Sequence, residues 1–188
     1  MKTKQIKEFS QEEAVSRCLG WQYIPPELRY GYDEIEKARN NKLPDLVKLE
    51  DLKGDIHTHS TYSDGSASIE TMVRAAVELG YEYVGISDHA PSVNSRGRKE
   101  VERIIIETRK EIDEINQKYP IKVMFGYEVN ILVNNQLALP NDLLQQLDYV
   151  IAGVHSSLSQ SKDEMTKRIV SAIENPHMDI LAHPLNRI

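Results

Sequence analysis

Five strand-like segments separated by helical patterns constrain the fold of this chain most strongly. The segments are rich in Val, Ile and Tyr and do not alternate cleanly between apolar and polar residues, as expected of strands covered on both faces. Strands joined through intervening helices form parallel sheets, because a parallel pair needs a long crossover connection. The sequence therefore predicts a parallel α/β fold. The expected strands lie at residues 54–60, 81–88, 121–130, 148–155 and 178–182.

Helix signals fall between these segments. Residues 68–79 carry a single apolar stripe, and residues 99–118 predict a long helix. Pro140 is expected to start a short helix, and the pairing of Ser161 with Glu164 predicts a capping box at the start of another. We expect a barrel in preference to a doubly wound sheet. No glycine-rich phosphate loop follows the first strand, which counts against a nucleotide-cofactor fold.

Five of the six histidines stand at or near the carboxyl ends of the expected strands, and Glu128 takes that place on the third strand. In α/β folds the active site lies at the carboxyl ends of parallel strands. Clustered imidazoles and carboxylates without cysteine suit zinc, manganese or iron. The sixth histidine, His177, is predicted to lie at the surface. We therefore expect a metal site formed by His57, His59, Asp64, His89, Glu128, His155 and His183.

Composition argues against several classes of function. The 188 residues carry a net charge of −6 with a pI near 5.6, which does not favour bulk electrostatic binding of nucleic acid. A phosphorylated substrate is compatible with this charge, because bound cations would reverse the local field. Cys18 is the only cysteine, so we expect no intrachain disulfide and a cytoplasmic setting. No apolar run approaches the ~18 residues of a membrane span, so no membrane partner is predicted.

Two parts of different composition are expected, a lead-in at residues 1–53 and the main domain at residues 54–188. The lead-in is polar, and a helix is predicted from Ser10. It either packs on the outside of the main domain or links it to an upstream domain, and a partly ordered tail is the alternative. A closed eight-unit barrel usually needs ~250 residues. Residues 54–188 are therefore expected to form an incomplete barrel of about five strands.

Six short motifs surround the expected metal ligands. They are Gly54-Asp55-Ile56-His57-Thr58-His59, Ser63-Asp64-Gly65, Ser87-Asp88-His89, Gly126-Tyr127-Glu128-Val129, Val154-His155-Ser156 and Ala182-His183-Pro184. Together they resemble the polymerase and histidinol phosphatase (PHP) superfamily of metal-dependent phosphoesterases. The likeness extends over residues 6–188 and is greatest to the PHP domain at the carboxyl end of bacterial family X DNA polymerases. It implies a distorted seven-stranded β/α barrel that holds two or three divalent metals.

The resemblance also implies roles for individual residues. Family members complete the first and third metal sites with an Asp-x-His pair near the end of the barrel, which this sequence lacks. Asn186 is a second departure, because related polymerase domains usually have glycine at this position. The implied ligands are His57 and His59 for a first metal, Glu128 bridging it to a second, His155 and His183 for that second metal, and Asp64 and His89 for a third.

Catalytic roles are expected for Asp88 and Arg187 in addition to Glu128. Asp88 either orients a histidine ring nitrogen or is a solvated or capping aspartate. Arg187 is expected to bind a substrate phosphate. For Arg96 and Arg98, a solvated loop is the preferred interpretation.

The leading functional prediction is a metal-dependent phosphoesterase that acts as a 3′–5′ exonuclease on single-stranded DNA ends, next to an upstream polymerase domain. The first alternative is a small-molecule phosphatase of the histidinol phosphate type. The second is a non-catalytic metal-binding or accessory module, which the short barrel favours. The sequence contains no Asp-x-Asp polymerase site, so no polymerase activity is expected from this chain.

Overall fold

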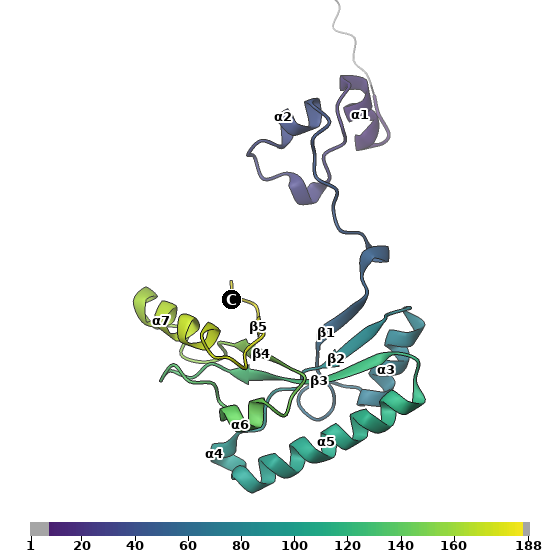
Figure 1. Ribbon diagram of the computed structural model, residues 1–188. Helices are drawn as coiled ribbons and strands as arrows, with labels where there is room; N and C mark the ends of the chain where they lie inside the picture. Colours follow the sequence, from purple (N-terminus) through teal and green to yellow (C-terminus); the bar gives the residue numbers. More distant parts are fainter. Residues whose placement is uncertain (1–7, 186–188) are drawn as a thin grey trace, which may run out of the picture. The chain divides into compact units, whose positions relative to one another are not determined.

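The chain folds as two compact units, Met1–Leu49 and Glu50–Ile188, and the computed structural model describes residues 8–185 (Figure 1). The division lies close to the boundary expected after residue 53, and the role of the lead-in as a linker stays a prediction. Among the helices of the described residues, none has both the length and the apolar character needed to cross a membrane.

The first unit is helical, and its described residues contain no strand. Helix α1 spans Glu12–Leu19 and α2 spans Glu34–Arg39, with a 3-10 turn at Pro26–Leu28 between them. The helix predicted from Ser10 begins two residues later, because Gln11 has the extended backbone of an N-cap residue. No residue of α1 is buried within the chain.

The second unit is built on a parallel sheet with the strand order β1-β2-β3-β4-β5. Each strand pairs with the next one in the sequence, so the chain advances around the sheet in one direction, as in a barrel. A doubly wound sheet would reverse its strand order at a switch point. The parallel α/β fold of barrel type is therefore confirmed, with five strands among residues 8–185. The strands are β1 Gly54–Thr58, β2 Tyr83–Ile86, β3 Lys122–Asn130, β4 Tyr149–Gly153 and β5 Ile180–Leu181.

The helices of this unit follow most of the predicted signals. Ser68 caps the first of them by accepting a hydrogen bond from the backbone N–H of Thr71. The capping box between Ser161 and Glu164 opens α7. Arg96, expected in a loop, ends a single helical turn instead. The helices are α3 Ile69–Glu78, α4 Val93–Arg96, α5 Arg98–Lys118, α6 Asn141–Leu144 and α7 Lys162–Ile173, with a 3-10 turn at Leu49–Asp51 before β1.

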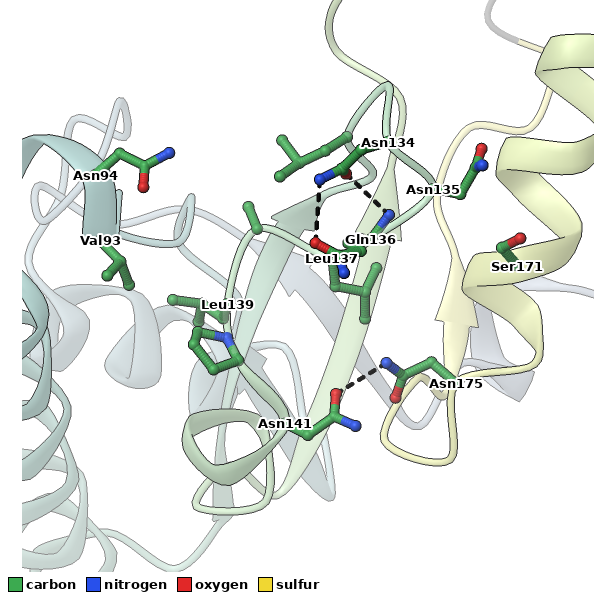
Figure 2. Close-up of a pocket in the computed structure, with 13 residues that line it drawn as sticks. Val93, Asn94, Asn134, Asn135, Gln136, Leu137, Leu139, Asn141, Ser171 and Asn175 are labelled. Carbon is green, nitrogen blue, oxygen red and sulfur yellow. Dashed lines mark hydrogen bonds between the residues drawn. The ribbon is translucent and has the colours of Figure 1, made fainter.

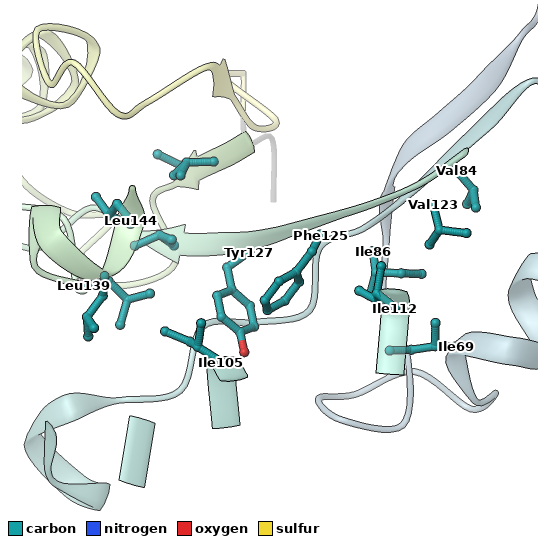
Figure 3. Packing of buried hydrophobic residues seen from close by; sticks show 14 of the residues in the cluster. Ile69, Val84, Ile86, Ile105, Ile112, Val123, Phe125, Tyr127, Leu139 and Leu144 are labelled. Atoms are coloured by element: carbon teal, nitrogen blue, oxygen red, sulfur yellow. The ribbon is translucent and has the colours of Figure 1, made fainter. Parts of the chain in front are cut away.

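Helices α3 and α5 cover one face of the sheet. Ile69 of α3 and Ile105 and Ile112 of α5 share a buried cluster with Phe125 and Tyr127 of β3 (Figure 3). Phe125 and Tyr127 are two residues apart on the same face of β3, and their ring centroids are 5.1 Å apart. Each of these side chains contributes about 1.5–3 kcal/mol to stability on full burial. Because this face of β3 is packed against helices, the residues between the aromatic ones point to the opposite face.

On that opposite face, a tyrosine hydrogen bond connects two strands that are not neighbours in the sheet. Tyr149 of β4 donates a hydrogen bond at 2.7 Å to the backbone oxygen of Ile56 in β1, three strands away. In a flat sheet three strand spacings would be about 14 Å, which is too far for a tyrosine side chain. The sheet is therefore strongly curved, with this face on the concave side. Gly85 and Gly126 make room for the side chain of Tyr149, because a Cβ at Gly85 would lie 2.3 Å from its hydroxyl oxygen and a Cβ at Gly126 would lie 2.6 Å from its ring.

Candidate metal centre

Glu128 lies at the centre of a group of histidine rings on the concave side of the sheet. Its neighbours along β3, Tyr127 and Val129, are buried in the helix-covered cluster, so the side chain of Glu128 points the other way. Only 3% of this residue is exposed. The curvature of the sheet brings the ends of the other strands toward it. The surrounding rings, which we call the histidine cluster, belong to His57, His59, His89, His155 and His183.

On one side of the site, Oε2 of Glu128 faces three rings. It lies 3.2 Å from Nε2 of His57, 3.3 Å from Nε2 of His59 and 3.4 Å from Nδ1 of His89. Asp64 faces the far side of two of them, with its Oδ1 3.0 Å from Nδ1 of His59 and its Oδ2 3.6 Å from Nε2 of His89. His59 and His89 therefore each present one ring nitrogen to Glu128 and the other to Asp64.

On the other side, Oε1 of Glu128 faces two rings. It lies 2.9 Å from Nε2 of His155 and 2.8 Å from Nε2 of His183, and these two nitrogens are 3.1 Å apart. The side chain of Asn130, at the end of β3, accepts a hydrogen bond from Nδ1 of His155. This bond leaves the lone pair on Nε2, the atom that faces Glu128. A Cβ at Gly153 would come within 3.0 Å of both rings, so glycine gives them their space.

Asp88 anchors the loop that carries Asp64. Its buried carboxylate accepts from the backbone N–H of Ser60 at 2.7 Å and from the hydroxyls of Ser60 and Ser63 at 2.6 Å each. The hydroxyl of Ser63 also lies 3.5 Å from Nδ1 of His59. Among the described residues, the hydrogen bonds of Asp88 go to this loop and not to a histidine. Its predicted orienting role stays a prediction, and its position favours support of the loop.

Tyr62 and Gly65 hold the rest of the loop in place. The hydroxyl of Tyr62 donates to Glu111 of α5 at 2.5 Å, and this hydrogen bond, together with burial, raises the pKa of Tyr62 to about 12. A Cβ at Gly65 would lie 2.0 Å from the backbone oxygen of His59, so only glycine fits. Sequence reasoning did not select Tyr62, Asn130 or the two loop serines. The signal for Asn130 was its spacing, two residues after Glu128 on the same face of a strand.

Electrostatics favour an ionised carboxylate at Glu128 and a neutral ring at His155. Burial raises the pKa of Glu128, but hydrogen bonds from His183 and His57 and the interaction with His155 outweigh it and hold the pKa below its usual value. Burial lowers the pKa of His155 despite the attraction of the carboxylate. An ionised carboxylate beside neutral imidazoles is the form that metal binding requires, because a proton competes with the metal for each ligand atom.

The spacing of these atoms fits divalent cations. Ligand atoms held tetrahedrally at about 2.0–2.1 Å from a metal are about 3.3–3.4 Å apart. The separations between Glu128 and the histidine cluster, from 2.8 to 3.4 Å, are close to this value. Three overlapping groups have their ligand atoms within 4.8 Å of one another, namely His57-His59-Glu128, His59-Asp64-His89 and His89-Glu128-His155.

The other predicted positions lie outside the histidine cluster. Arg187 is outside the described residues. Arg98 starts α5 and pairs with Glu102 and Asp142, so it is engaged within the chain. Arg96 ends α4 and lines a cavity of about 670 Å³ that Asp64 and His89 also line. His177 lies in the turn before β5 and is partly exposed.

A curved parallel β/α sheet with imidazoles and carboxylates gathered at its strand ends defines the class of metal-binding α/β barrel domains. The family model described as the PHP domain matches residues 55–183 of this chain, which includes every residue of the site. The chain therefore belongs to the PHP domain family, as the resemblance of its motifs implied.

Individual relatives cover the chain to different extents. The DNA polymerase/3′-5′ exonuclease PolX of Bacillus subtilis is 36% identical over 189 residues, which cover 100% of this chain and 33% of that protein. A probable phosphatase of Thermoanaerobacter sp. is 32% identical over 140 residues, 71% of this chain and 54% of the relative. A probable phosphatase of Acetivibrio thermocellus is 29% identical over 136 residues, with shares of 70% and 54%. The chain thus spans about one third of the first relative and about half of the other two.

Proposed function

We propose that this chain is a metal-dependent phosphoesterase domain. The observation that supports this most directly is the buried carboxylate of Glu128, whose two oxygens face separate groups of imidazoles. Such a donor set suits two zinc, manganese or iron ions side by side, with the carboxylate between them. The proposed ligands are His57 and His59 for one ion, His155 and His183 for the next, Glu128 for both, and Asp64 and His89 for a third.

The residues of the chain contribute placement and charge to this chemistry. When bound, two neighbouring divalent cations acidify a water molecule and neutralise the charge on the phosphoryl oxygens. Glu128 stays ionised and directs one oxygen toward each ion position. Asn130 keeps the proton of His155 on Nδ1, so that Nε2 is available as a ligand. Asp88 holds the loop that places Asp64.

At a finer level, we propose 3′–5′ exonuclease activity on single-stranded DNA ends. Support comes from the PolX relative, whose match includes the first unit, whereas the phosphatase matches cover about 70% of the chain. An upstream polymerase domain is the corresponding partner, in a cytoplasmic setting. Because the chain has a net charge of −6, bound cations would have to supply the attraction for DNA phosphates.

Two other functions remain as alternatives. A small-molecule phosphatase is supported by the relatives named probable phosphatases, which match the part of the chain that holds the site. A non-catalytic accessory module is the other. Hydrolysis of single-stranded DNA without hydrolysis of histidinol phosphate would favour the exonuclease over the phosphatase.

Substitution of Glu128 tests the proposal. Elemental mass spectrometry should find two or three zinc, manganese or iron ions on the wild-type chain and fewer on Glu128→Gln. Phosphoesterase activity should fall by at least about 100-fold, since even substitutions behind metal ligands cost 10–100-fold. Glu82→Gln is the matched control, because Glu82 is exposed and its carboxylate forms a surface ion pair with Lys53.

The outcomes separate the three functions. Activity unchanged in Glu128→Gln would contradict both enzymatic proposals. Metal bound by the wild-type chain without turnover of DNA or phosphomonoesters would leave the accessory module.

A further inference from the structure

The second unit contains a cavity of about 620 Å³ (Figure 2). It lies between the segment that follows β3, the start of α6 and the second half of α7, with α4 at one end. Among its described lining residues, none carries a charged side chain. Carboxamides dominate instead, so we call it the amide cavity; they belong to Asn94, Asn134, Asn135, Gln136, Asn141 and Asn175.

The amide cavity adjoins a smaller cavity at the metal centre. That cavity, of about 250 Å³, is lined by His89, Glu128 and His155 of the centre. Asn94 on α4 lines both cavities. A ligand whose phosphate lies at the metal centre would therefore have its remaining part close to the amide cavity. The residues that line both cavities are Val93, Asn94, Leu132 and Ala138.

Hydrogen bonds between the carboxamides leave donors free. Asn134 donates to Oε1 of Gln136 at 3.0 Å, and Asn175 donates to Oδ1 of Asn141 at 3.0 Å (Figure 2). The amino groups of Gln136 and Asn141 and the whole carboxamide of Asn94 have no hydrogen-bond partner within residues 8–185. The rim of the cavity can therefore donate to and accept from a neutral ligand without displacing an existing bond.

Apolar side chains complete the lining. Leu137 and Leu139, which are 8% and 1% exposed, lie beneath the carboxamides, next to Pro140. A lining of this kind suits a flat ring with polar edges and apolar faces, because carboxamides pair with the edges of nucleobases and apolar groups pack on their faces. It does not suit the cationic amine of an amino alcohol phosphate, since no carboxylate among the described lining residues would balance that charge.

We propose that the amide cavity is a base-binding subsite, so that the substrates of the metal centre are nucleotides. This inference rests on the proposed phosphoesterase function and adds the part of the substrate that lies beside the phosphate. The nucleobase is the shared chemistry of free mononucleotides and of nucleic acid ends. The carboxamides bind its edge, and the phosphate is left at the histidine cluster.

Nucleoside binding tests the subsite separately from hydrolysis. Deoxyadenosine has no phosphate, so its binding to the full chain does not depend on metal. Titration followed by nitrogen-15 NMR should shift the side-chain amide signals of Asn94 and Gln136. Gln136→Leu should weaken binding of deoxyadenosine 5′-monophosphate about tenfold, as expected when one carboxamide–base contact is lost. Deoxyribose 5-phosphate, which lacks the base, should bind with equal affinity to the wild-type chain and to Gln136→Leu.

Gln117→Leu is the matched control, because Gln117 is an exposed glutamine on α5 that lines neither cavity. Gln136 is exposed too, so an unchanged unfolding temperature is expected for both variants. Deoxyribose 5-phosphate binding as tightly as the mononucleotide, or nucleoside binding unaffected by Gln136→Leu, would overturn the subsite. Tighter binding of a trinucleotide than of the mononucleotide would support the subsite and would indicate that its ligands are the ends of nucleic acid strands. Nucleoside binding in a chain without phosphoesterase activity would support the subsite and reject the proposed function alone.

Discussion

Gly153, at the end of β4, gives two rings of the histidine cluster their space. A Cβ there would lie 2.9 Å from Cε1 of His183 and 3.0 Å from Cε1 of His155. We expect Gly153→Ala to displace these rings and to weaken metal binding about 10–100-fold, the range for substitutions beside metal ligands. Competition against a chromogenic chelator measures this affinity.

Gly126→Ala is the control for the added methyl group. Its Cβ would lie 2.6 Å from the ring of Tyr149, within the concave core and not against the histidine cluster. We expect the free energy of unfolding to fall by about 1–3 kcal/mol, the usual cost of overpacking. Metal affinity should change far less than in Gly153→Ala. Equal losses of affinity in the two variants would mean that Gly153 acts through the sheet and not through the rings.

At the scale of elements, the loop after β1 depends on one carboxylate. Asp88 accepts three hydrogen bonds from Ser60 and Ser63, and Asp88→Asn would remove part of this accepting capacity. We expect a loss of about 1–3 kcal/mol in unfolding free energy, since a buried donor is left unsatisfied, together with weaker metal binding beside Asp64. Denaturant unfolding and chelator competition measure the two effects. Asp142→Asn applies the same change to an exposed ion pair and should have little effect; if it matched Asp88→Asn, the loop would not be the cause.

The elements also show how far the sequence could predict the structure. The order of the strands and helices and the gathering of His155 and Glu128 follow from strand periodicity and from the rule that parallel strands end at one rim. The first strand ends at Thr58, earlier than expected, because its pairing with β2 becomes irregular after Asp55. Arg168 could not be found in this way. It is fully buried and bonds to backbone oxygens of two loops that are distant in sequence, a contact that no local pattern encodes.

At the scale of the whole second unit, the metal centre joins the two ends of the sheet. His57 belongs to β1, and His183 follows β5, yet their ring centroids are 6.1 Å apart. Both rings face Glu128 on the central strand. In the sheet itself β1 and β5 are the outermost strands, and each pairs on one side only among the described residues. Cations at this position would therefore connect strands that backbone hydrogen bonds leave far apart.

Removal of metal is expected to lower the stability of this unit and to loosen its outer strands first. A ligand present at 100 times its dissociation constant adds about 2.7 kcal/mol to folding, which corresponds to about 5–10 °C in unfolding temperature for a domain of this size. Calorimetry with and without a chelator measures the shift. Hydrogen exchange should accelerate in β1 and β5 more than in β3, whose core packing does not depend on metal. Glu128→Gln should show smaller effects, since it already binds fewer ions. An equal shift in that variant, or uniform acceleration across all strands, would show that the stabilising cations bind elsewhere.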